Sequence, residues 1–399
     1  MATLMRGGCG EGNMMVEVRM RRLMLLVGAA VSIVLAVTAA MASSRPVGFQ
    51  TGLQTEIPVS FPSGSNTLSG ILWLPAGDGP HAAVVILSGS DREGTSNTTY
   101  EYHARTLVGS GVAVLVYDPP GVGRSTGDHR LETLDDRALE AVAAVDYLRS
   151  RPEIRPDAVG VWGVSQGGWV TQMAAAMSKN VAFVVSVSGS GVSVAEQQVY
   201  SVEAQSRAAR FSKLNIAKAG LFARLLVDWQ LTRPVYRQQT MPQVRRLGPG
   251  PWKAFADLVY RPGSLTPAQN LKRGIAILNS ISHRGWARYL YLNTAVLPAL
   301  KAIPPSQLAA AKAAAEKSLL TQPKKYLTAV RCPVLAIWGE DDTVVPARKS
   351  AALYRKYLAA AGNDDVTIVL FAHAGHSINN FSPAYWNTLT GWLHQHLAT

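Results

Sequence analysis

Seven apolar segments of six or seven residues recur along the chain, and polar or helical sequence separates most of them. They are 68–74, 82–88, 112–117, 158–164, 181–187, 332–338 and 366–371. Apolar segments of this length are typical of strands buried on both faces of a parallel sheet. Helices are predicted near 99–109, after Thr133, and near 167–178, 347–361 and 384–397. Strands that alternate with helices predict an α/β fold, in which helices cover both faces of a mostly parallel sheet.

The helix that follows Thr133 begins with a capping signal, because Asp136 stands three residues further on. Residues three and four positions apart lie on one side of a helix, so its apolar residues are expected to form a stripe against the sheet. That stripe would consist of Leu139, Val142, Ala143 and Val145.

The alternation stops near residue 190 and resumes at 332, and the sequence between is strongly basic. Residues 201–330 hold 20 Lys and Arg against 4 Asp and Glu, a net charge of +16; the whole chain carries +13, so the rest sums to −3. The segment also contains a strong helix former at 305–320 and several Trp and Tyr residues. Such charge indicates either a solvated basic surface or a surface that faces an anionic substrate or an anionic lipid. Nucleic acid is not an expected partner, because no recognisable binding module accompanies the charge.

The N-terminal sequence is typical of an export signal. An Arg-rich stretch at 19–22 precedes the apolar segment 23–42, which ends with small residues at Ala40 and Ala42. The alternative is an uncleaved anchor, since about 20 apolar residues can span a bilayer. We therefore expect residues 1–42 to be a signal peptide or a membrane anchor, and the rest of the chain to be exported to the periplasm or secreted.

The overall composition predicts a large folded chain. With 399 residues and 48% apolar content, the protein can bury a sizeable core. Of its two cysteines, Cys9 lies in the targeting segment and leaves Cys332 alone, so no intrachain disulfide is predicted. The sequence shows neither an internal repeat nor a Cys/His pattern typical of metal sites.

One serine stands between glycines at the end of a predicted buried strand. The segment 163–167, Gly-Val-Ser-Gln-Gly, fits the pattern G-x-S-x-G between a strand and a helix. Such a turn strains the backbone of the serine and exposes its hydroxyl above the sheet, and the flanking glycines remove side chains that would collide. The following helix directs N–H groups at the same spot. This pattern predicts that Ser165 is a nucleophile.

A serine hydroxyl needs a base to accept its proton and a third group to orient that base. The loop after the sixth predicted strand contains Asp341 and Asp342, and the loop after the seventh contains His373 and His376. Acid and histidine therefore follow the serine in the order expected for this architecture.

Several stretches of the chain share the motifs of one superfamily. They are "LSGSDREGT" (87–95), "YDPPGVGRS" (117–125), "GVSQGG" (163–168), "GEDDTVVP" (339–346) and "HAGHS" (373–377). On these motifs the chain resembles the serine α/β-hydrolases, and most of all bacterial esterases and acyl hydrolases. The resemblance implies an α/β-hydrolase fold with an inserted helical cap. We expect the catalytic domain at 43–195 and 326–399, and the cap at 196–325.

The resemblance also assigns the partners of the serine. The family pattern G-x-x-D-x-x-V-P places the acid on Asp342, with Asp341 as the alternative. The family's Gly-His ending places the base on His376, with His373 as the alternative. Asp118 is similar to a structural aspartate of the family, and we expect it to support the scaffold.

An oxyanion hole needs two N–H groups that face the developing negative charge. The residue after the nucleophile, Gln166, is expected to supply one. The resemblance places the other in the loop after the strand at 82–88, where the family usually shows His-Gly-x. This chain has Ser88, Gly89 and Ser90 there, so Ser90 is the expected donor, and a shorter loop could move the contact to Gly89 or Asp91.

Together these residues imply an exported serine hydrolase that cleaves small carboxylic esters through an acyl-enzyme, without a cofactor or metal. A thioesterase, an acyltransferase or a peptidase could use the same triad. A non-catalytic binding protein on a hydrolase scaffold is the third hypothesis, and the intact Ser165, Asp342 and His376 argue against it.

Overall fold

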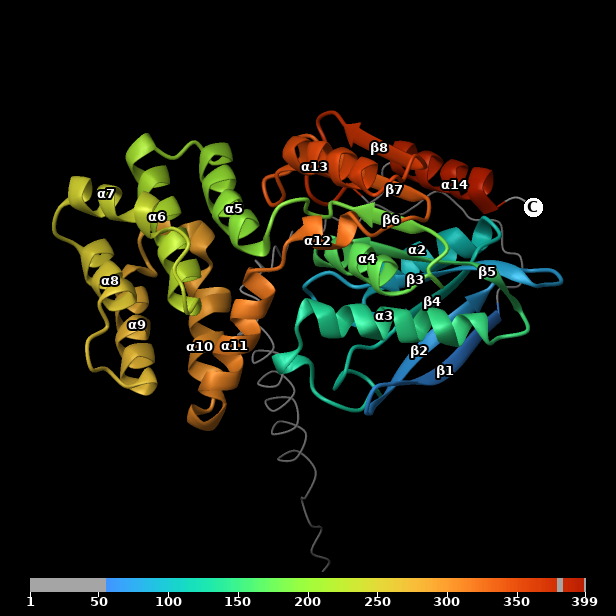
Figure 1. Ribbon diagram of the computed structural model, residues 1–399, viewed down its shortest axis with the longest axis horizontal. Helices are drawn as coiled ribbons and strands as arrows, with labels where there is room; N and C mark the ends of the chain where they lie inside the picture. Colours follow the sequence, from blue (N-terminus) through green and yellow to red (C-terminus); the bar gives the residue numbers. More distant parts are fainter. Residues whose placement is uncertain (1–54, 379–382, 398–399) are drawn as a thin grey trace, which may run out of the picture.

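The computed structural model describes residues 55–378 and 383–397, and its centre is an eight-stranded sheet (Figure 1). The strands are β1 (Thr55–Ser63), β2 (Asn66–Leu74), β3 (His81–Leu87), β4 (Ala113–Tyr117), β5 (Ile154–Val164), β6 (Val184–Val187), β7 (Val334–Gly339) and β8 (Val366–Phe371). They lie in the order β1-β2-β4-β3-β5-β6-β7-β8. The pairings of β2 with β1 and β4 are antiparallel, and the other five are parallel. The predicted mostly parallel sheet is confirmed.

Each of the seven predicted strands is present, and β1 is an additional one. β8 matches its prediction at both ends, whereas β5 begins earlier, at Ile154, and β6 begins later, at Val184. β1 was not predicted because it has no continuous apolar segment, as befits a strand at the edge of the sheet. Only its Val59 and Phe61 are buried, and their neighbours are more exposed.

Helices cover both faces of the sheet, as predicted. They are α2 (Thr98–Gly109), α3 (Leu134–Arg149), α4 (Gln166–Met177), α13 (Ala347–Ala360) and α14 (Pro383–Leu397). Successive side chains of a strand point to opposite faces. In β3, Val85 and Leu87 therefore belong to the apolar core beneath α3, α4 and α13, while Val84 and Ile86 belong to the core beneath α2 and α14.

α3 packs on the sheet with a different side from the predicted one. Leu139 was expected on the apolar stripe but is 56% exposed, and of the predicted stripe only Val145 is fully buried. The buried residues are Leu134, Arg137, Ala138, Glu140, Ala141, Ala144, Val145 and Leu148. The prediction was wrong because Arg137 and Glu140 occupy the buried side, where their polar character hides the helical period.

A helical insertion separates β6 from β7 and lies to one side of the sheet (Figure 1). Its helices are α5 (Val194–Ala208), α6 (Lys213–Gln230), α7 (Arg237–Leu247), α8 (Pro251–Tyr260), α9 (Pro267–Ile281), α10 (Leu297–Ala302), α11 (Leu308–Leu319) and α12 (Pro323–Leu327). Between α9 and α10 lie a 3-10 turn (Gly285–Leu290) and a π-helical turn (Leu292–Val296). Phe222 of α6 packs against Phe255 and Trp286, so the insertion has apolar packing of its own. We call Val194–Leu327 the insertion and the rest of the described chain the sheet region.

Hydrogen bonds and ion pairs join the insertion to the sheet region. The hydroxyl of Tyr200 on α5 donates to the carbonyl oxygen of Asp342 (2.9 Å). The hydroxyl of Tyr326 on α12 donates to Asp135 Oδ1 (2.7 Å), and Lys317 Nζ of α11 lies 3.1 Å from Asp135 Oδ2. The insertion therefore contacts both the loop after β7 and the first turn of α3.

The predicted signal peptide or anchor at 1–42 lies outside the described residues. Within 55–378 and 383–397, no helix is both long enough and apolar enough to cross a membrane. Cys332 stands just before β7, is half-buried and carries a free thiol.

Candidate active site

Ser165 occupies a sharp turn between β5 and α4. Its backbone has φ 55° and ψ −114°, a left-handed conformation that residues other than glycine rarely adopt. The flanking glycines make the turn possible. A Cβ at Gly163 would lie 2.4 Å from the carbonyl oxygen of Gly167, and a Cβ at Gly167 would lie 2.4 Å from the carbonyl oxygen of Leu87. The G-x-S-x-G spacing thus follows from steric contacts on both sides of the serine.

The structure brings Ser165, His376 and Asp342 into one chain of hydrogen bonds. His376 Nε2 lies 2.9 Å from Ser165 Oγ, and His376 Nδ1 lies 2.8 Å from Asp342 Oδ2. The three residues follow β5, β8 and β7, at the carboxyl ends of parallel strands. In this arrangement the carboxylate can orient the imidazole and the imidazole can take the serine proton.

The carboxylate of Asp342 is fully buried and well supplied with donors. Its Oδ1 accepts hydrogen bonds from the backbone N–H groups of Val344 (2.7 Å) and Val345 (2.8 Å), and its side chain has no exposed surface. Hydrogen bonds from N–H groups stabilise a buried carboxylate, which leaves Oδ2 to face the imidazole. The acid is therefore held in one orientation by its own loop.

The alternative acid and base lie away from this chain of hydrogen bonds. His373 Nδ1 is 3.9 Å from Asp341 Oδ2, and their side chains are 95% and 68% exposed. The backbone N–H of Asp341 donates to the carbonyl oxygen of Ala374 (2.9 Å), which ties the acid loop to the base loop. Asp341 and His373 thus lie at the surface beside the site.

Two residues that the sequence analysis did not single out support the base and the acid. Ser188 Oγ, after β6, donates to the carbonyl oxygen of His376 (2.8 Å). Tyr200 of the insertion does the same for the carbonyl oxygen of Asp342, and burial together with the nearby Asp342 raises the pKa of Tyr200, so its hydroxyl stays a donor. The one signal for Ser188 is its position directly after a predicted strand, while nothing in the sequence indicates the contact of Tyr200.

The predicted oxyanion donors lie on two segments next to the nucleophile. Gln166 begins α4, so its N–H belongs to the helix N-terminus. The N–H of Gly89 donates to Tyr100 Oη (2.7 Å), and that hydroxyl donates to Asp91 Oδ2 (2.5 Å), so Gly89 is not the donor. In the described part of the chain, the N–H of Ser90 has no hydrogen-bond acceptor. The expected donor Ser90 and the alternative Asp91 both remain.

The buried aspartate of the "YDPPGVGRS" motif supports this loop from below. Asp118 Oδ1 accepts hydrogen bonds from the backbone N–H (2.8 Å) and the hydroxyl (2.6 Å) of Thr95. Its carbonyl oxygen accepts from Ser125 Oγ (2.7 Å). These contacts are those of a scaffold residue, as the sequence predicted.

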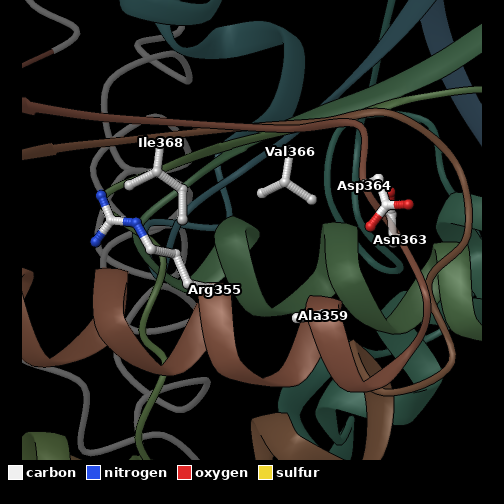
Figure 2. A pocket seen from close by; sticks show the side chains of 6 residues that line it. All are labelled: Arg355, Ala359, Asn363, Asp364, Val366 and Ile368. Atoms are coloured by element: carbon white, nitrogen blue, oxygen red, sulfur yellow. The ribbon is translucent and has the colours of Figure 1, made fainter.

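A separate surface pocket lies between α13 and β8, on the opposite side of β8 from α14. Figure 2 shows Arg355 and Ala359 on the helix, Val366 and Ile368 on the strand, and Asn363 and Asp364 on the connecting loop. None of the residues that line it belongs to the candidate triad. Across the described ranges, no three His, Cys, Asp or Glu side chains gather as a metal site would require.

Curated relatives are similar to about a third of the chain. A thiohydrolase (aneE) of Aspergillus aculeatus is 34% identical over 121 residues, which are 30% of this chain and 37% of the relative. Human acyl-coenzyme A thioesterase 1 is 30% identical over 136 residues, or 33% of this chain and 30% of the relative. The matched part thus spans about a third of the length of these relatives.

Solved structures and the family pattern cover more of the chain. An esterase of Pyrococcus furiosus superposes over 89% of this chain and 97% of its own with a TM-score of 0.51 at 15% sequence identity, which shows a shared fold alone. The sequence pattern of the alpha/beta hydrolase fold family matches residues 92–383, well over half of the chain. The protein therefore belongs to the α/β-hydrolase fold family.

Proposed function

We propose that this protein is a serine hydrolase that transfers the acyl group of a small carboxylic ester to Ser165 and then to water. The observation that carries the proposal is the chain of hydrogen bonds from Ser165 through His376 to Asp342 at a strained strand-to-helix turn. Nucleophilic catalysis by a serine requires a base in contact with the hydroxyl and an acid that orients the base, and this site has both.

In the first half of the reaction, Ser165 Oγ attacks the acyl carbonyl carbon while His376 Nε2 takes the hydroxyl proton. Asp342 stabilises the imidazolium that forms. The tetrahedral oxyanion accepts hydrogen bonds from the N–H groups of Gln166 and Ser90. His376 then gives its proton to the leaving oxygen, and the carbon–oxygen bond breaks. In the second half, His376 takes a proton from water, whose oxygen attacks the acyl carbon. The bond between that carbon and Ser165 Oγ then breaks, His376 returns the proton to Oγ, and the acid leaves.

Thioesters are the second candidate substrates. The curated relatives are a thiohydrolase and acyl-coenzyme A thioesterases, and each matches about a third of this chain. The same steps apply when the leaving atom is sulfur, and a thiolate leaves without full protonation. The geometry of the triad is compatible with either leaving atom.

The charge of the insertion favours a substrate that is presented with negative charge, either an acidic ester or an ester at an anionic lipid surface. Of the 20 Lys and Arg at 201–330, four form ion pairs with described carboxylates: Arg207, Arg224, Lys253 and Lys317. The other 16 have no such partner among the described residues. A surface groove lined by Phe211, Trp286 and Tyr291 also carries Arg284 and Arg288. Aromatic rings beside unpaired cations suit a ligand with an apolar body and an anionic end.

A panel of substrates with one acyl group tests the proposal. Each acyl length is offered as a neutral ester, an ester with an anionic leaving group and a thioester, at low and high salt. We expect ester hydrolysis by the natural chain and none by Ser165→Ala. We also expect a lower KM for the anionic ester than for the neutral one at low salt. High salt should abolish this difference, because it screens charges over about 8–10 Å. Absence of both ester and thioester hydrolysis would overturn the assignment.

Export is a separate part of the proposal, and the sequence of residues 19–42 supports it. Fractionation of cells that express the full chain tests it. Recovery of the protein in the periplasm, medium or membrane fraction supports export, with a shortened N-terminus where the signal is cleaved. Recovery of the intact chain in the cytoplasm contradicts it.

A further inference from the structure

Arg137 is a charged residue on the buried face of α3. It is 4% exposed, and the face around it is otherwise mostly apolar. Burial of a guanidinium is costly unless hydrogen bonds and opposite charge compensate it. Its retention at this position therefore needs partners, and these partners lie in the candidate active site.

The guanidinium of Arg137 joins the two segments that carry the predicted oxyanion donors. Nη1 donates to Oε1 of Gln166, the first residue of α4. Nη2 donates to the carbonyl oxygen of Ser88 (2.5 Å) and to Ser88 Oγ (3.2 Å), in the loop after β3. An arginine suits this role because its planar fork places two donors at a fixed spacing, which a lysine cannot do.

The peptide unit between Ser88 and Gly89 is held from both sides. Its carbonyl oxygen accepts from Arg137, and its N–H donates to Tyr100 Oη (2.7 Å). The carbonyl and the N–H of a trans peptide point in opposite directions, so two such bonds fix the orientation of the peptide plane. The N–H of Ser90 belongs to the next peptide unit, so a fixed Ser88–Gly89 peptide limits the positions that this N–H can take.

The charge of Arg137 is compensated within the same buried region. Glu140, one turn further along α3, is 5% exposed, and Arg92 lies close to both residues and pairs with Glu132. Burial raises the pKa of Glu140, while the charges of Arg92 and Arg137 act in the opposite direction. Replacement of Arg137 by lysine keeps a cation in this region and removes the fork.

We infer that Arg137 is a positioning residue of the oxyanion hole: it fixes the loop of Ser90 relative to the N-terminus of α4. The inference rests on the proposed function and adds the residue that aligns its two donors. Loss of a single oxyanion donor costs about 10²–10³-fold in kcat, and misalignment of about 1 Å costs about 10²-fold. Since both donors remain in a variant of Arg137, we expect a loss of about 10- to 100-fold.

The test compares Arg137→Lys with the natural chain and with Arg149→Lys, a matched change on the same helix. Arg149 bonds the carbonyl oxygen of Pro156, outside the site. We measure kcat and KM for one ester, inhibition by a boronic acid that forms a tetrahedral adduct, and the melting temperature. Arg137→Lys should lower kcat and leave KM nearly unchanged. It should also weaken inhibition by the boronic acid by the same factor as it lowers kcat/KM. Arg149→Lys should change neither kcat nor inhibition by the boronic acid.

A purely structural role would lower the melting temperature of Arg137→Lys and leave kcat and boronic acid binding of the folded fraction unchanged; that result overturns the inference. Where Arg137→Lys does not fold, Gln166→Met removes the acceptor of Nη1 and keeps the backbone N–H. A kcat equal to that of the natural chain in this variant overturns the inference equally. If the natural chain hydrolyses no ester or thioester, the proposed function fails first, and the inference fails with it.

Discussion

The sheet region and the insertion differ in how they use charge. The sheet region, at 55–193, 328–378 and 383–397, holds 14 Lys and Arg and 19 Asp and Glu. The buried charges among them lie in networks, as when Arg137 bridges Ser88 and Gln166. In the insertion, the few acids satisfy nearby groups. Asp228, for example, accepts from two backbone N–H groups and from the hydroxyl of Tyr260. Most of the cations there have no carboxylate partner in the part of the chain that the structure describes.

This difference separates two tasks. In the sheet region, buried charges with hydrogen-bond partners hold groups at fixed distances, which the proposed catalysis needs because misplaced groups lose rate steeply. In the insertion, cations without a carboxylate partner among the described residues create a positive potential, which would act on an anionic ligand before contact and be weakened by salt. We therefore expect substitutions in the sheet region to change kcat and substitutions of insertion cations to change KM.

The largest effect is expected from the nucleophile. Ser165→Ala should lower kcat by about 10⁴-fold or more, because removal of one triad member abolishes covalent catalysis. The change removes a single oxygen, so circular dichroism and the melting temperature should stay close to those of the natural chain. Full hydrolysis by the variant would contradict the assignment.

The acid and the base should be nearly as sensitive. Asp342→Asn and His376→Ala should each cost about 10⁴-fold in kcat, since the first loses the charge that orients the imidazole and the second loses the base. Asp341→Asn and His373→Ala are matched controls on the same loops and should cost little. If either control proves more damaging than its neighbour, the assignment of the triad is wrong.

The contact between the two regions at Tyr200 should have a moderate effect. Tyr200→Phe removes the hydrogen bond to the carbonyl oxygen of Asp342, worth about 1 kcal/mol net, or about fivefold in kcat/KM if the loop shifts. The effect should fall on kcat. Tyr289→Phe, elsewhere in the insertion, provides the comparison, and equal losses in both variants would rule out a specific role for the contact.

The groove cations should have a smaller effect, confined to charged substrates. The double variant Arg284→Gln and Arg288→Gln should raise KM about threefold for the anionic ester at low salt and leave the neutral ester unchanged. Arg245→Gln with Arg246→Gln removes the same charge from α7, outside the groove. An equal rise in KM for both pairs would mean that net charge acts without a local site.

The junction between the regions should resist modification. Burial raises the pKa of Cys332 to about 11, so its thiolate, the reactive form, is scarce at pH 8. Alkylation by iodoacetamide, followed on the Cys332 peptide by mass spectrometry, should be slow in the native chain, rise as pH approaches 11 and become fast in urea. Rapid labelling at pH 8 without urea would show that the junction opens readily.

The sequence allowed prediction of the sheet and the triad because both leave local signals. Buried parallel strands appear as continuous apolar segments, and the turn around Ser165 needs glycines at fixed positions, since a Cβ at Gly163 or Gly167 would strike the backbone. The loops that carry the acid and the base could be located because each directly follows one of these apolar segments, β7 or β8. The family resemblance then favoured Asp342 over Asp341 as the acid. In the structure Asp342 contacts His376, whereas Asp341 lies exposed at the surface.

The rest depends on contacts between residues far apart in the sequence. Arg137 meets Ser88 and Gln166 across 49 and 29 positions, and Tyr200 meets Asp342 across 142. No local pattern records such pairs, and the polar residues on the buried side of α3 even misdirected the predicted stripe toward Leu139. Edge strand β1 was missed because only part of it is buried.

The identity of the nucleophile is tested most directly by finding which serine reacts with an irreversible inhibitor. The natural chain is treated with a fluorophosphonate, which reacts with activated serines, and the modified peptide is mapped by mass spectrometry. We expect a single adduct on Ser165 that forms far more slowly in His376→Ala and is absent in Ser165→Ala. An adduct on another serine, or none in the folded natural chain, would contradict the claim that Ser165 is the nucleophile.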